Sequence, residues 1–160
     1  MKNKAVKTNA TRALAAAKVE FETFEYDYDE SDLSGVHIAN EMGEDPDLVY
    51  KTLVTKGEKT GINVFCIPVE KELDLKKCAS LVGDKKIEMI HVKDLLALTG
   101  YIRGGCSPVG MKKLYPTYID ESAKALQKIY VSAGKIGGQI YINPVDLAEF
   151  VKANFADIVK

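Results

Sequence analysis

Residues 49–69, which read VYKTLVTKGEKTGINVFCIPV, carry the clearest indication of the fold. Residues 49–54 and 62–69 are rich in apolar and β-branched side chains, which favour strands. Between them lies a polar segment, 57–61, with a glycine at each end. Two apolar runs joined by such a short turn predict an antiparallel hairpin. We therefore expect a strand pair near the middle of the chain.

Helices and strands follow one another irregularly on both sides of this hairpin. Helices are predicted at 10–16, 36–42, 75–82, 92–98, 122–126 and from Pro144 onward, and a polar loop at 30–35. Strands are predicted at 21–28, 118–120, 128–133 and 139–143, and 101–103 is expected to be extended. This order lacks a regular strand–helix–strand repeat, so it indicates an α+β fold. We expect a mixed, largely antiparallel sheet, closed or barrel-like, with peripheral helices.

Length and composition are typical of an ordinary globular chain. Its 160 residues fit one domain, 1–160, of which 1–7 are expected to form a flexible tail. No apolar run reaches the roughly 20 residues of a membrane span, and no secretory signal is recognisable, so we expect a cytoplasmic protein. The formal net charge of −1 argues against tight, nonspecific nucleic-acid binding. Lysine pairs at 76–77, 85–86 and 112–113 could form either a local RNA-binding patch or merely solvated faces.

The cysteines and histidines do not form a recognisable metal-binding set. Cys66, Cys78 and Cys106 are odd in number, lie far apart and lack CxxC spacing, so they predict neither a disulfide framework nor a zinc site. His37 and His91 are isolated as well. We therefore expect no metal.

A protein nucleophile or an acid–base pair is also hard to find. Cys106 adjoins Ser107, but either side chain needs a base and an orienting group nearby to act as a nucleophile. The sequence places neither histidine beside them, so we interpret Cys106 as a small loop residue. Asp27 and Asp29 lie at a polar strand end and give no sign of acid–base pairing.

Lys51 is the most informative single residue. In a strand at 49–54, alternation places Lys51 with Val49 and Leu53 on one face and Thr52 on the other. Both faces are largely apolar, and a buried ammonium is unfavourable unless it is paired or lines a pocket. Two interpretations stay open: Lys51 lines a pocket, or it lies at the end of an edge strand and extends outward to solvent.

Two glycine-rich segments are candidate ligand loops. The first, 104–110, reads GGCSPVG, and the second, 134–138, reads GKIGG. Glycine allows the backbone to come close to a ligand and to direct N–H groups at an anion or a carbonyl oxygen. The first loop lacks the spacing of phosphate-binding fingerprints, and the second joins two predicted strands. Each is equally compatible with a tight turn that requires glycine.

Three segments match one known family in their order and spacing. They are YKTLV at 50–54, GGCSPVGMKK at 104–113 and YVSAGK at 130–135, and DIV at 157–159 fits as well. Together they resemble the YbaK/EbsC family of Cys-tRNA(Pro) deacylases, which is related to the editing domain of bacterial prolyl-tRNA synthetases. The resemblance runs from about Ala10 onward, and the GGxSPxGxKK segment is its most specific part.

This resemblance implies a trans-editing hydrolase that cleaves the ester between a mischarged amino acid and the 3′-terminal adenosine of tRNA. Lys51 matches the family's essential lysine, which holds the substrate through the ester carbonyl or a phosphate. The substrate-binding positions implied are Tyr26, Thr52, Gly104, Gly105, Ser107, Ser132, Gly134 and Gln139. No metal or other cofactor is implied. The implied partners are aminoacyl-tRNA of the proline type and prolyl-tRNA synthetase, with no membrane.

The chemistry implied for a cysteinyl substrate uses the substrate's own thiol, while the enzyme orients it and stabilises the oxyanion. Two departures from the family pattern leave the amino acid open. Leu33 and Ser34 stand where a phenylalanine often precedes the glycine that matches Gly35, and Gln139 stands where many members have aspartate. The alternatives are an Ala-tRNA(Pro) deacylase, which would use water or the tRNA's 2′-hydroxyl, and a non-catalytic module that binds tRNA or a synthetase.

Overall fold

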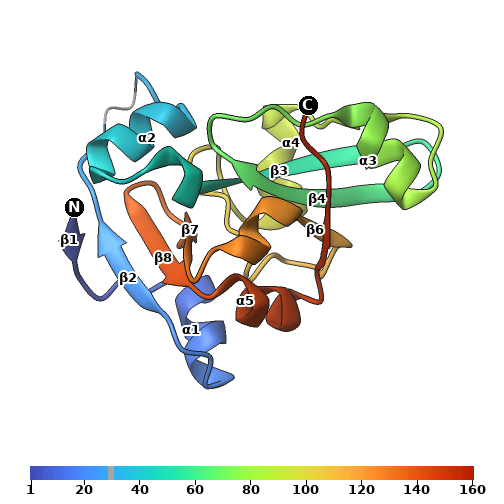
Figure 1. The fold of residues 1–160 in the computed structure, drawn as a ribbon. Helices are drawn as coiled ribbons and strands as arrows, with labels where there is room; N and C mark the ends of the chain where they lie inside the picture. Colours follow the sequence, from blue (N-terminus) through green and yellow to red (C-terminus); the bar gives the residue numbers. More distant parts are fainter. Residues whose placement is uncertain (29–30) are drawn as a thin grey trace.

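The predicted hairpin is present and forms the centre of the larger of two sheets (Figure 1). Its strands, β3 (Tyr50–Gly57) and β4 (Gly61–Pro68), pair antiparallel over their whole length. Gly61 has a φ of 73°, in the left-handed region where glycine is favoured, so the residue type suits the turn into β4. The computed structural model describes residues 1–28 and 31–160. Asp29 and Glu30, which belong to the carboxylate pair considered above and to the expected loop at 30–35, lie outside the described residues.

The other elements surround this hairpin. The remaining strands are β1 (Lys2–Asn3), β2 (Glu22–Glu25), β5 (Ile87–Met89), β6 (Thr117–Asp120), β7 (Ile129–Ser132), β8 (Gly138–Ile142) and β9 (Asn154–Ala156). The α-helices are α1 (Asn9–Ala16), α2 (Gly35–Met42), α3 (Leu75–Val82), α4 (Val92–Thr99) and α5 (Pro144–Val151). Two short 3-10 helices, η1 (Pro46–Leu48) and η2 (Glu121–Ala125), precede β3 and β7.

The strands form two open sheets. One has the order β1-β2-β8-β7 and is antiparallel throughout. The other has the order β5-β3-β4-β6-β9, and in it β6 pairs parallel with both β4 and β9. The prediction of an α+β domain with a mixed, largely antiparallel arrangement is confirmed. In the described part of the chain, a single bridge, Val49↔Tyr130, connects the two sheets.

The predicted closed or barrel-like sheet is wrong. Closure would require β7 to pair along the outer edge of β3, but that pairing ends after the bridge at Val49. β5 takes up the same edge only at Thr55–Gly57. The segment in between, 50–54, is bordered instead by α2, α4 and the loop around Gly104, and these elements enclose a pocket. The interruption of the sheet therefore creates the site described below.

Both faces of the larger sheet are covered, which explains the continuous apolar run of β4. Phe65 and Ile67 face α3 and pack with Cys78. Cys66, which points to the other face, belongs to the main core together with Leu147 of α5. Figure 1 shows α3 above and α5 below the β3–β4 pair. A strand that is buried on both faces reads as apolar without alternation.

Local signals in the sequence set the helix ends. Asp74 caps α3 through the backbone N–H groups of Lys76 and Lys77. Gly43, Gly83 and Gly100 adopt the left-handed conformation at the ends of α2, α3 and α4, as the sequence predicts. In the described residues, no helix is both long and apolar enough to cross a membrane.

Other segments differ from the predictions. The N-terminal residues, expected to form a tail, contribute β1, which pairs with β2, and bury Val6 in the main core. The segment 101–103, expected to be extended, pairs with neither sheet, and the Tyr101 hydroxyl donates to the Val109 carbonyl across the glycine loop. The helix expected at 122–126 is the 3-10 helix η2, and β9 has no local signal that we recognised.

Candidate active site

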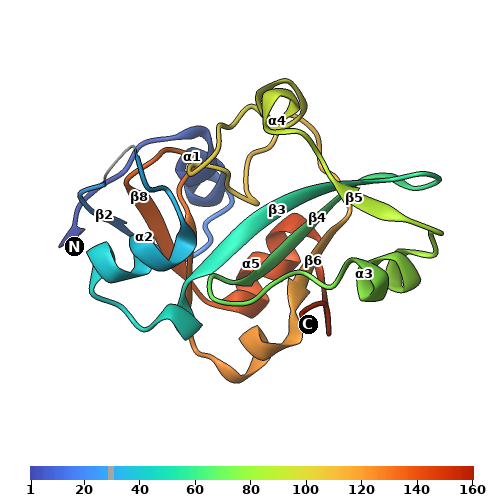
Figure 2. The same ribbon diagram turned by 90° about the horizontal axis from the view of Figure 1, so that it is seen from above.

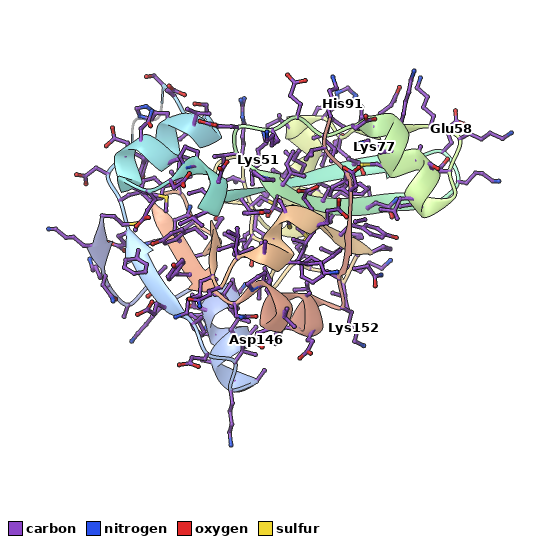
Figure 3. The ribbon with its side chains drawn as sticks, in the orientation of Figure 1. Lys51, Glu58, Lys77, His91, Asp146 and Lys152 are labelled. Atoms are coloured by element: carbon purple, nitrogen blue, oxygen red, sulfur yellow. The ribbon has the colours of Figure 1, made fainter. Side chains whose placement is uncertain are left out.

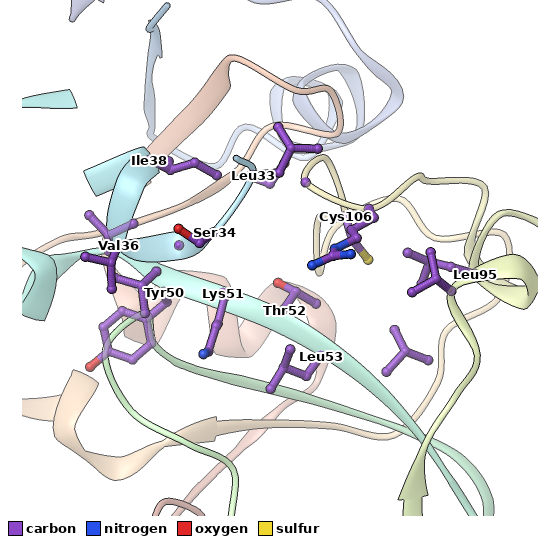
Figure 4. Close-up of a pocket in the computed structure, with 18 of the residues that line it drawn as sticks. Leu33, Ser34, Val36, Ile38, Tyr50, Lys51, Thr52, Leu53, Leu95 and Cys106 are labelled. Carbon is purple, nitrogen blue, oxygen red and sulfur yellow. The ribbon is translucent and has the colours of Figure 1, made fainter. Parts of the chain in front are cut away.

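A pocket of about 460 Å³ lies along the interrupted outer edge of β3 (Figure 4). Residues 50–54 of β3 form its floor. The N-terminal part of α2 lines one side, and Val92 and Leu95 of α4 line another. Figure 2 shows these two helices flanking β3. The pocket therefore combines a strand edge, two helices and the first glycine loop.

Lys51 extends from β3 and lines this pocket (Figure 4). Figure 3 labels its place among the side chains of the whole molecule. Its pairing with Ile67 on β4 places it on the apolar face shared with Leu53. Among the described residues, its ammonium has no hydrogen bond or ion pair, although Glu72 acts on it from a distance. Partial burial lowers the pKa of Lys51, and the charge of Glu72 opposes this shift. Of the two interpretations of Lys51 left open by the sequence, the pocket is the one observed.

Thr52 also borders the pocket, and its hydroxyl lies 3.7 Å from the Cys66 sulfur as a weak hydrogen-bond partner. Burial raises the pKa of Cys66 to about 12, so its thiol stays protonated at neutral pH. Tyr50, two residues before Thr52, is held in place because its hydroxyl lies 2.7 Å from the Ser122 hydroxyl. These contacts hold the floor of the pocket in one conformation.

The first two residues of the first glycine loop, Gly104 and Gly105, have different roles. Gly104 borders the pocket and has a φ of 85°, a conformation that a side chain rarely adopts. Gly105 does not border the pocket, and its N–H donates to the Ile102 carbonyl at 3.0 Å. A Cβ on Gly105 would lie 2.9 Å from the Ile136 backbone nitrogen. Gly105 is therefore required for the packing of the two glycine loops against each other.

The strands on either side of the second glycine loop contribute Ser132 of β7 and Gln139 of β8 to the pocket wall. These two residues pair across β7 and β8, so they lie side by side at the ends of the strands. The Ser132 hydroxyl accepts a hydrogen bond from the Gly134 N–H. Gly134 itself does not border the pocket; its φ is 96°, and a Cβ there would lie 2.8 Å from the Tyr101 ring.

Tyr26 lies behind this wall without lining the pocket. Its side chain is 6% exposed, and burial raises the pKa of its hydroxyl. The side-chain amide of Gln139 lies near enough to oppose that pKa shift. Among the described residues, neither the Tyr26 hydroxyl nor the Gln139 carbonyl oxygen has a hydrogen-bond partner. Among the buried side-chain oxygens of the described residues, only these two lack a partner.

Cys106 lines the pocket, but Ser107 does not. The Ser107 hydroxyl is fully buried and accepts the Val109 N–H, which gives it a role in the turn. Burial raises the pKa of Cys106 to about 12, and His37 and His91 are absent from the pocket lining. Within residues 1–28 and 31–160, no three His, Cys, Asp or Glu side chains lie together as metal ligands would.

Most of the apolar wall was not anticipated from the sequence. Val36, Ile38 and Val69 line the pocket, and the helix that carries two of them was predicted without a role. Leu33 and Ser34, which depart from the family pattern, line the pocket as well. The signal available was Gly35, since a Cβ there would lie 2.7 Å from the Val69 side chain. A glycine at the start of a helix is a sign of such close packing.

Arg103 was also missed, although it directly precedes the glycine loop. Together with Lys51 it makes the pocket cationic, because the lining contains no carboxylate among the described residues. Two cations around an apolar cavity suit a ligand with both an anionic part and a small apolar part.

Comparison with known proteins identifies the family to which this fold and pocket belong. Residues 35–150 match the aminoacyl-tRNA editing domain, and the chain belongs to this family, which confirms the resemblance seen in the sequence. It is 49% identical over 152 residues to EbsC of Enterococcus faecalis (strain ATCC 700802 / V583), a protein named as a Cys-tRNA(Pro)/Cys-tRNA(Cys) deacylase, with 95% of this chain and 93% of EbsC covered.

More distant relatives point to prolyl-tRNA synthetase. The chain is 28% identical over 105 residues to the proline–tRNA ligase of Shouchella clausii (strain KSM-K16), covering 66% of this chain and 18% of the ligase. It also resembles a crystal structure described as a trans-editing enzyme for prolyl-tRNA synthetase. That match has a TM-score of 0.82 and 25% identity, and it covers 98% of this chain and 99% of the other.

Proposed function

We propose that this protein is a trans-editing deacylase that removes cysteine from mischarged Cys-tRNA(Pro). The observation that carries the proposal is the position of Lys51, a half-buried and unpaired ammonium that lines the same pocket as Gly104 in an aminoacyl-tRNA editing domain. The name of EbsC, which is 49% identical to this chain, supports the same substrate.

The proposed reaction uses the thiol of the substrate. The cysteine sulfur bonds to the ester carbonyl carbon, and the bond from that carbon to the 3′ oxygen of tRNA breaks. The thiol proton ends on that oxygen, so the products are a cyclic thioester of cysteine and uncharged tRNA. Holding the thiol against the carbonyl can contribute on the order of 7–11 kcal/mol at the upper limit of such effects.

The polar groups that border the pocket each have a proposed role in this reaction. Lys51 holds the ester carbonyl or the terminal phosphate through its ammonium. The Gly104 N–H has no partner among the described residues, so it is free to stabilise the oxyanion. Thr52, Ser132 and Gln139 complete the amino-acid pocket. Tyr26, Gly105, Ser107 and Gly134 support these residues from behind.

Two further proposals concern the setting of the reaction. We assign the protein to the cytoplasm, where charged tRNA is used. We also expect prolyl-tRNA synthetase to present the tRNA, because the net charge of −1 provides little general attraction for RNA. The likeness to proline–tRNA ligases supports this choice of partner.

The decisive experiment measures deacylation of Cys-tRNA(Pro) and Ala-tRNA(Pro), with and without prolyl-tRNA synthetase. Wild type, Lys51→Ala and the control Lys56→Ala, an exposed lysine on the same strand, are compared. We expect loss of Cys-tRNA(Pro) that depends on Lys51 and not on Lys56. Activity on Ala-tRNA(Pro) alone would reassign the substrate. Inactivity on both, even with the synthetase, would indicate a non-catalytic binding module.

A further inference from the structure

The carbonyl oxygen of Gln139 is an unsatisfied acceptor in the wall of the pocket. The residue is 4% exposed, and its Oε1 has no hydrogen-bond partner among the described residues. A buried acceptor without a partner is unfavourable, because it has lost its hydrogen bonds to water. Such exceptions in a native structure call for an explanation, and a bound ligand is one.

Gln139 lines the pocket, although its carbonyl oxygen is itself closed off from solvent. Its amide lies close enough to the Tyr26 hydroxyl to lower the pKa of that group. The terminal torsion of a glutamine is broad, so a small rotation brings the oxygen to the cavity that the residue already lines.

The chemistry of the missing partner follows from the acceptor. A carbonyl oxygen requires a hydrogen-bond donor. In the aminoacyl part of the proposed substrate, the α-amino group is the strong donor, since a thiol donates weakly and the methyl group of alanine does not donate. The pocket already holds two cations, Lys51 and Arg103, so an ammonium can enter favourably only where an acceptor meets it.

We propose that the Gln139 carbonyl oxygen binds the free α-amino group of the aminoacyl ester and makes the enzyme specific for unblocked aminoacyl-tRNA. This inference rests on the proposed function and adds a substrate class that the site excludes. Tyr26 is a positioning residue in this arrangement, because its side chain lies beside the amide of Gln139. N-blocked substrates, such as N-acetylaminoacyl-tRNA or peptidyl-tRNA, lose the donor charge and are poor substrates.

The kinetic test compares Cys-tRNA(Pro) with N-acetyl-Cys-tRNA(Pro), which keeps the thiol and the ester. We expect wild type to prefer the free amine by about 10- to 100-fold in kcat/KM, the range of one hydrogen bond to a charged group. Gln139→Leu should lose this preference by slowing only the free-amine substrate. Gln127→Leu, the same change at the other glutamine of the chain, which is exposed, should keep it.

Equal slowing of both substrates by Gln139→Leu would overturn the proposal, because a merely structural role affects them alike. A wild type without the preference would overturn it too, while leaving the proposed deacylase function intact. A binding measurement protects against a variant that fails to fold. Calorimetry on wild type with 3′-cysteinylamino-3′-deoxyadenosine and its N-acetyl form should show tighter binding of the free amine, and equal affinities or no binding would refute the assignment.

Discussion

Gly105 and Ile136 bring the two glycine loops into direct backbone contact. A Cβ on Gly105 would lie 2.9 Å from the Ile136 nitrogen and 3.0 Å from the Lys135 carbonyl carbon. Gly104 belongs to the first loop, and Ser132 and Gln139 flank the second. All three residues border the pocket. The contact therefore sets the distance between two walls of the site.

Gly105→Ala is expected to damage both stability and activity. The added methyl group meets backbone that cannot rotate away, so the loops must separate, at a cost of about 1–3 kcal/mol in the free energy of unfolding. Urea denaturation and deacylation rates measure the two effects. Gly43→Ala is the control: its φ of 70° makes the change unfavourable, but it lies at the far end of α2 and should leave the rate unchanged. Full activity in Gly105→Ala would contradict a role for this contact in the site.

Lys51→Met is expected to lower the deacylation rate by about 100-fold or more, the usual effect of removing one oxyanion donor. The same change is expected to increase the free energy of unfolding at neutral pH. Burial lowers the pKa of Lys51, so the folded protein holds this proton less tightly than the unfolded chain, whose ordinary pKa is 10.5. Between the two pKa values the unfolded chain binds more protons, and wild-type stability rises with pH through this window. The advantage of Lys51→Met should therefore shrink as the pH approaches 10.5. Denaturation of both proteins across this range measures it, and a constant difference would argue against burial as the cause.

Cys106→Ser is expected to retain most of the activity. Cys106 is 9% exposed, and burial raises its pKa to about 12, so it provides almost no thiolate at neutral pH. Stability should fall by about 1–3 kcal/mol if the new hydroxyl finds no partner. Cys78→Ser, in the core under α3, serves as the control for stability alone. A loss of rate as large as that of Lys51→Ala would instead identify Cys106 as a nucleophile.

Asp84→Asn is expected to loosen the tip of the β3–β4 hairpin. The Asp84 carboxylate accepts hydrogen bonds from the Lys59 and Thr60 N–H groups and from the Thr60 hydroxyl. These bonds lower the pKa of Asp84 well below its ordinary 3.8, so the stabilisation is complete above 3.8 and is lost as the pH falls through the folded value. The difference in urea midpoint between wild type and variant should be constant from pH 7 to 5 and shrink below 3.8. Glu58→Gln, at an exposed position of the same turn, should show no such trend.

The local structure of this protein could be predicted largely from its sequence. The hairpin follows from two apolar runs around a glycine turn, and the ends of α2, α3 and α4 follow from glycines that alone adopt the left-handed conformation easily. Lys51 could be singled out because a cation in an apolar strand needs a reason. The family motifs implied a role in the site for the glycine loops but did not separate Gly104, at the pocket, from Gly105, which holds the loops together.

The arrangement of the two sheets could be seen only in the tertiary structure. The parallel pairing of β6 with β4 joins segments about fifty residues apart, and nothing in either segment specifies the other, since many apolar strands satisfy the same local rules. The break in pairing after Val49, which leaves the edge of β3 open, depends on the packing of α2 and both glycine loops at once. That the Gln139 carbonyl oxygen lacks a partner likewise depends on the tertiary structure. A sequence states which groups can form hydrogen bonds, whereas only the folded chain determines which of them find a partner.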